Sequence, residues 1–136
     1  MNQPQIVAGA ESQAAPRFDV LIVGAGSGGI AAAASLRKRN PQLRIVIIDP
    51  AESHYYQPGW TMVGGGVFHA AETRRETRNL IPHGVEWLRQ AVIGFRPQEN
   101  AVILDDRQLV YYSQLIVAPG LRLNWEAIPG LKDSLG

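Results

Sequence analysis

The chain has 136 residues, a formal net charge of +1, 46% hydrophobic residues and no cysteine. This length suits one globular domain with a real core, and the small net charge argues against a dedicated nucleic-acid-binding protein. The lack of cysteine excludes disulfides, thiolate metal ligands and cysteine redox chemistry within these residues. No apolar run approaches the ~18 residues of a membrane-spanning helix.

The first predicted element is a strand that leads into a helix. Residues 1–16 are rich in Gln, Ala and Ser and are predicted to form a flexible tail without a signal-peptide pattern. The apolar run Phe18–Val23 predicts a parallel strand buried on both faces. A glycine-rich turn follows, and then an alanine-rich helix over about 28–39, which Asn40-Pro41 ends.

The turn between this strand and helix matches G-x-G-x-x-G, with Gly24, Gly26 and Gly29 at the motif positions. In this pattern the first glycine allows the tight turn, the second lets a phosphate approach the backbone, and the third lets the helix pack closely on the strand. The N–H groups and dipole of the helix start then bind a pyrophosphate. The motif predicts dinucleotide binding, and the alternative is a plain glycine-rich strand–helix turn.

Asp49 ends a second predicted strand, Arg44–Ile48, near the ~20-residue offset at which an acidic residue meets a ribose. An ionised carboxylate accepts hydrogen bonds from ribose hydroxyls and repels a 2′-phosphate. This position therefore favours NAD or FAD over NADP, and the alternative is a solvated acid at a strand end.

Residues 50–84 contain many prolines and glycines and are predicted to be irregular. Within them, residues 69–80 have helical composition with a charged, solvated face. The three histidines, His54, His69 and His83, lack metal-ligand spacing and are expected in loops or on the surface. No residue of the chain is assigned as a metal ligand.

Short β-like runs fill the rest of the chain. We predict a strand over Val85–Leu88, a three-stranded meander over 91–95, 101–104 and 108–112, and a return strand over 115–118 that Pro119-Gly120 breaks. The predicted fold is α/β: a Rossmann-like FAD/NAD(P)-binding domain whose parallel sheet carries a three-stranded β-meander.

The stretch Tyr112–Gly120, together with the β-α-β start, resembles flavoproteins with two dinucleotide-binding domains, the pyridine nucleotide-disulphide oxidoreductases. Their return strand usually ends in Ala-Thr-Gly, whereas this one ends in Ala-Pro-Gly and so lacks a hydroxyl near the flavin. The stretches 49–61 and 81–87 and the run from Gly120 through Leu131 are similar to the sulfide:quinone oxidoreductase branch. The resemblance covers about residues 18–131.

The resemblance implies FAD as the cofactor. The residues it implies as FAD-binding are Gly24, Gly26, Ser27, Gly28 and Gly29 at the pyrophosphate, Asp49 at the adenosine ribose, Gln57 near the flavin side, Val92 at the adenine, and Pro119 and Gly120 closing over the FAD. Many relatives have Glu in place of Asp49. The alternative for Gln57 is a side chain that caps a loop, and Tyr55, Tyr56 and Trp60 are expected to be core aromatics.

The family oxidises sulfide through a cysteine pair and passes electrons through FAD to a membrane quinone. Those cysteines, the second dinucleotide-binding domain and the membrane-attaching C-terminal part lie beyond the matched region. We therefore expect residues 17–120 to be an FAD-binding segment and 121–136 the start of a linker, with no catalytic residue and no activity alone. Sulfide and quinone are the implied partners of the parent protein. We expect the parent protein in the cytoplasm or peripherally on the inner membrane.

Two other interpretations stay open at this point. One is a segment of a type II NADH dehydrogenase-like flavoprotein, and the other is a non-catalytic nucleotide-binding module. The sequence is compatible both with a fragment and with a naturally short protein.

Overall fold

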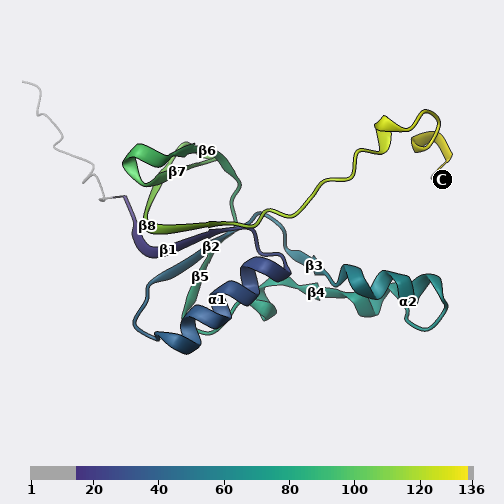
Figure 1. Ribbon diagram of the computed structural model, residues 1–136, viewed down its shortest axis with the longest axis horizontal. Helices are drawn as coiled ribbons and strands as arrows, with labels where there is room; N and C mark the ends of the chain where they lie inside the picture. Colours follow the sequence, from purple (N-terminus) through teal and green to yellow (C-terminus); the bar gives the residue numbers. More distant parts are fainter. Residues whose placement is uncertain (1–14, 135–136) are drawn as a thin grey trace, which may run out of the picture.

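The computed structural model describes residues 15–134, so residues 1–14 of the predicted tail and the last two residues lie outside the described part. Figure 1 shows a sheet with a long helix on one side, a projecting arm and an extended C-terminal segment. The strands are β1 (Arg17–Val23), β2 (Ile45–Ile48), β3 (Ser53–Tyr55), β4 (Arg74–Glu76), β5 (Val85–Leu88), β6 (Val92–Arg96), β7 (Ala101–Leu104) and β8 (Leu109–Val117), and the α-helices are α1 (Ser27–Arg39) and α2 (Trp60–Gly64).

The main sheet has six strands in the order β5-β2-β1-β8-β7-β6. The first four are parallel to one another, and β7 and β6 continue the sheet with antiparallel pairing. Strand β1 is central, because Leu21 lies opposite Val46 of β2 on one side and Leu115 of β8 on the other. The predicted α/β, Rossmann-like fold with its meander is confirmed.

The core consists of two hydrophobic clusters on opposite faces of β1 and β2. Successive side chains of a strand point to opposite faces. Accordingly, Leu21 and Val46 pack with residues of the meander, whereas Ile22 and Ile47 pack with Ala33 of α1. Helix α1 and the meander therefore lie on opposite sides of these two strands, as Figure 1 shows. Burial on both faces is the reason that β1 and β2 are apolar at almost every position.

One strand was predicted as two. The expected third meander strand and the return strand form a single nine-residue strand, β8, which pairs with β7 over Leu109–Tyr111 and with β1 over Tyr111–Val117. Ser113 and Gln114, which separate the two predicted runs, are polar and exposed, and the strand continues through them. Polar side chains on an exposed face do not interrupt a ladder of backbone hydrogen bonds.

The helical interpretation of residues 69–80 was wrong. The segment consists of two 3-10 turns, Ala70–Thr73 and Thr77–Leu80, separated by β4. The backbone of β4 pairs with β3, and this tertiary contact overrides the local helical preference. The charged side chains of this segment are exposed, as predicted. We call residues 53–80, which comprise the β3–β4 hairpin and α2, the arm.

Thr77 connects the arm to the loop after β2 through two hydrogen bonds. Its side chain is 1% exposed, its Oγ1 donates to the Ala51 carbonyl at 2.7 Å, and its N–H donates to the Glu52 carbonyl at 2.9 Å. Thr77→Val replaces the hydroxyl with a methyl group of similar size, and we expect it to lower the free energy of unfolding by about 1–2 kcal/mol in urea denaturation. Thr61→Val, at an exposed position of α2, is the control and should change stability by less than about 0.5 kcal/mol. Equal stabilities of the two variants would contradict this role.

Candidate dinucleotide-binding site

A cleft lies at the carboxyl ends of the parallel strands, where the chain turns outward after β1 and later returns as β8 on the other side of β1. This is the topological switch point at which open α/β sheets bind ligands. The cleft has a volume of about 420 Å³. Six of the predicted site residues line it: Gly26, Ser27, Asp49, Gln57, Pro119 and Gly120.

The glycines of the motif have distinct structural roles. Gly24 has φ of +105°, and a Cβ there would lie 2.2 Å from the Ala118 carbonyl oxygen. A Cβ on Gly29 would lie 1.9 Å from the Gly24 carbonyl oxygen. Gly26, in contrast, faces open space, with no atom within 4 Å of its Cβ position. Gly24 and Gly29 therefore allow backbone segments of the turn to pack closely, while Gly26 leaves room for a ligand atom to approach the backbone.

The amino end of α1 opens into this space. Gly26 is the N-cap residue, no side chain caps the helix, and the first turn has no acidic residue. The first N–H groups of a helix have no intrahelical acceptor and carry a partial positive charge. An open glycine beside an uncapped helix start fits the pyrophosphate of a dinucleotide.

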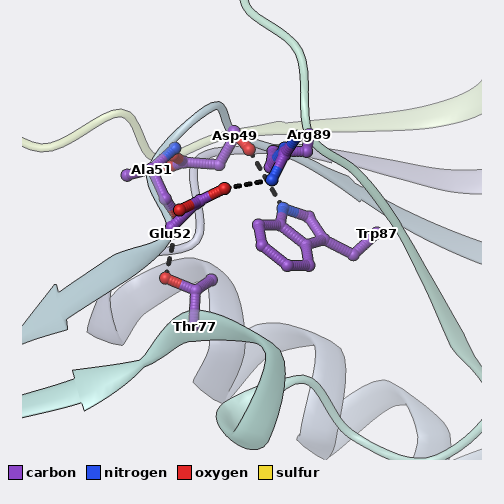
Figure 2. A network of polar contacts seen from close by, with 6 residues as sticks. All are labelled: Asp49, Ala51, Glu52, Thr77, Trp87 and Arg89. Atoms are coloured by element: carbon purple, nitrogen blue, oxygen red, sulfur yellow. Dashed lines mark hydrogen bonds and ion pairs between the residues drawn. The ribbon is translucent and has the colours of Figure 1, made fainter.

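The Asp49 carboxylate is held by backbone N–H groups of the glycine turn and of the loop after β2. Its Oδ2 accepts from the Ala25 N–H and its Oδ1 from the Ala51 N–H, each at 2.7 Å. The Asp49 carbonyl accepts from Trp87 Nε1 at 3.0 Å, as Figure 2 shows. Each carboxylate oxygen keeps a second lone pair, so the side chain still has acceptors for ribose hydroxyls. The sequence predicted a ribose contact for Asp49, but it did not predict that the carboxylate accepts from the Ala25 and Ala51 N–H groups.

A polar network surrounds Asp49 (Figure 2). It contains the Thr77 contact to Ala51 and an ion pair between Glu52 and Arg89. Both side chains of this pair are more than half exposed, so solvent screens their attraction. The Trp87 and Thr77 hydrogen bonds, which are partly buried, therefore do more to hold the loop after β2.

The aromatic residues of the arm do not belong to the core. Tyr55, Tyr56 and Trp60 are 47%, 54% and 46% exposed, so the expectation of core aromatics was wrong. They belong to neither core cluster, because the arm projects from the main sheet (Figure 1). Tyr55 and Trp60 make an edge-to-face contact with ring centroids 6.3 Å apart, and both line the cleft.

Four predicted site residues are not among those that line the cleft. Gly24 and Gly29 are the packing glycines described above, and Gly28 lies on the first turn of α1, where a Cβ would meet only the Ala118 side chain at 3.9 Å. Val92 begins β6, and its side chain packs against the core cluster on the meander side. Its contact with an adenine stays a prediction.

His54 was expected in a loop or on the surface, but it lies in β3 and lines the cleft. Its Nδ1 is 3.3 Å from the carbonyl oxygen of Ala25 in the glycine turn. Its position five residues after Asp49 indicates that it is near the same end of the sheet, but only the tertiary structure brings its ring to Ala25.

Within residues 15–134, no cluster of three or more His, Asp or Glu side chains could hold a metal ion. No helix in the same part of the chain has the length and apolar character needed to cross a membrane.

The sheet order, the glycine turn and the acidic residue after β2 define a Rossmann-like dinucleotide-binding domain. The family model of the pyridine nucleotide-disulphide oxidoreductases matches residues 18–136, and the chain belongs to this family. This family and its sulfide:quinone oxidoreductases are FAD-dependent.

Similar proteins include the mitochondrial sulfide:quinone oxidoreductase of Dictyostelium discoideum, 42% identical over 118 residues, which cover 86% of this chain and 26% of the relative. The fold is shared with the sulfide:quinone oxidoreductase structure from Aquifex aeolicus, with a TM-score of 0.67, 23% identity, and coverage of 82% of this chain and 26% of that one. It is also shared with NDH2 from Plasmodium falciparum in complex with NADH, with a TM-score of 0.63, 18% identity, and coverage of 85% and 25%. The chain thus spans about a quarter of the length of these proteins.

Proposed function

We propose that this chain binds the ADP portion of FAD and forms the N-terminal FAD-binding segment of a sulfide:quinone oxidoreductase. The observation that carries the proposal is the cleft that brings Gly26, Ser27 and Asp49 together beside the uncapped start of α1. The identity of 42% to a sulfide:quinone oxidoreductase supports this branch of the family.

In this proposal each part of the cleft contacts one part of the cofactor. The backbone N–H groups of Gly26 and Ser27 bind the pyrophosphate, in a turn shaped by Gly24 and Gly29, and Asp49 accepts from the ribose hydroxyls. Gln57, Pro119 and Gly120 lie on the flavin side, and the region of Val92 meets the adenine. FAD, when bound, supplies the two-electron redox chemistry.

The proposal extends to the parent protein as follows. Residues 17–120 are the FAD-binding segment and 121–136 begin the connection to the rest of the enzyme, whose substrates are sulfide and a quinone. Since this chain has no cysteine, the sulfur nucleophile must come from elsewhere in the parent. We place the parent peripherally at a membrane, where a lipid-soluble quinone resides.

A second candidate is a type II NADH dehydrogenase-like enzyme, because the fold is also shared with NDH2. The downstream sequence of the gene separates the two. A pair of cysteines favours sulfide as the electron donor, whereas a second intact G-x-G-x-x-G motif without them favours NADH.

The proposal predicts a preference for the ADP half of the cofactor. The aromatic and apolar residues beside the flavin end are exposed, with Trp60 46%, Leu121 74% and Trp125 45% accessible to solvent. Each Å² of the isoalloxazine ring that stays in water forfeits roughly 25 cal/mol of burial free energy. We expect isothermal titration calorimetry of the chain to show ADP binding, FAD binding little tighter, and FMN binding hardly at all.

Two results would change this view. No binding of ADP or FAD would contradict the proposed function. Tight binding of FMN would show that the flavin pocket is complete within the chain and would make the chain a flavoprotein in its own right.

A further inference from the structure

The peptide groups of the glycine turn are held from two directions. Ala25, at 4% exposure, donates its N–H to Asp49 Oδ2 at 2.7 Å, while its carbonyl oxygen lies 3.3 Å from His54 Nδ1. Asp49 follows β2 and His54 belongs to β3. The arm is therefore connected directly to the turn that precedes α1.

The His54 contact fixes the direction of a neighbouring N–H group. The Ala25 carbonyl and the Gly26 N–H belong to one planar trans peptide unit, so they point in opposite directions. The Ala25 carbonyl accepts from His54. Within residues 15–134, no group accepts a hydrogen bond from the Gly26 N–H. This N–H is thus oriented and left free to donate to a ligand in the cleft that Gly26 lines.

The contact also defines the proton position on the imidazole ring. Only a protonated Nδ1 can donate to a carbonyl oxygen, so the neutral ring has its proton on Nδ1. A side chain that places an N–H at the Nδ1 position therefore reproduces the interaction, whereas a ring without nitrogen does not.

We propose that His54 is a positioning residue of the phosphate-binding turn: it holds the Ala25–Gly26 peptide so that the Gly26 N–H donates to the diphosphate of an adenine dinucleotide. The proposal rests on the proposed function, because it presumes that a diphosphate occupies the cleft. It assigns His54 to phosphate recognition and leaves recognition of the adenosine to other residues.

The test compares ADP with adenosine in the 136-residue chain and its variants. His54→Phe keeps a ring of similar size without a donor, and His54→Asn places an amide N–H near the Nδ1 position. We expect His54→Phe to weaken ADP binding about tenfold in calorimetric titration and to leave the response to millimolar adenosine, followed by NMR, within about twofold. His54→Asn should recover most of the ADP affinity. The control His83→Phe, at an exposed position, should match the wild type.

Four outcomes would overturn the proposal, and they are distinguishable. Unchanged ADP affinity in His54→Phe would show that the contact does not position the turn. An equal loss for ADP and adenosine, or no recovery in His54→Asn, would show a general structural role. Absence of ADP binding by the wild type would overturn the proposed function together with this inference.

Discussion

Gly29→Ala is expected to destabilise the protein by about 3 kcal/mol or more, enough to leave much of the chain unfolded. The added Cβ would lie 1.9 Å from the Gly24 carbonyl oxygen and 3.1 Å from its carbon, and both are backbone atoms. They cannot rotate away as a side chain can, so α1 and β1 would have to separate. Urea denaturation followed by circular dichroism measures the loss.

The neighbouring position on the same helix provides the control. In Gly28→Ala the nearest atom to the new Cβ is the Ala118 Cβ at 3.9 Å, an ordinary contact. Alanine has the higher helix propensity, so this variant should be as stable as the wild type or gain up to about 1 kcal/mol. If Gly29→Ala were as stable as Gly28→Ala, the close packing of strand and helix at this turn would be incorrect.

Asp49→Ala is expected to affect both binding and stability. ADP affinity should fall at least about tenfold, because ribose hydroxyls lose a charged acceptor. The free energy of unfolding should fall by about 1–3 kcal/mol, because the Ala25 and Ala51 N–H groups each lose an acceptor at 2.7 Å. Calorimetry with ADP and urea denaturation measure the two effects separately.

Asp19 offers a matched control near the amino end of β1, whereas the cleft lies beyond the carboxyl end of this strand. The Asp19 Oδ2 accepts from the Arg44 N–H at 2.7 Å. Asp19→Ala should therefore lower stability modestly and leave ADP affinity unchanged. If Asp49→Ala bound ADP as tightly as Asp19→Ala, Asp49 would hold the turn without contacting the ribose.

The elements that surround the glycine turn could be predicted because their signals are local. An apolar run predicts a buried parallel strand, as Phe18–Val23 did, and the strand predicted over 44–48 is likewise buried. The spacing of Gly24, Gly26 and Gly29 predicts a strand–turn–helix unit, and the structure has it, with the closest packing at the first and third glycines. An acidic residue that follows the next parallel strand is expected at the carboxyl ends of the strands, beside the glycine turn, and Asp49 lies there.

The sequence by itself thus determined the fold class, the position of the cleft and most of the residues proposed to line it. Tertiary structure alone decided that β8 is one strand and that residues 74–76 form a hairpin with β3, because both depend on backbone partners distant in the chain. The same holds for His54, whose contact with Ala25 spans 29 positions, and for Trp87, which reaches Asp49 across 38. Such contacts form only when separate elements pack together, so no local pattern of residue types predicts them.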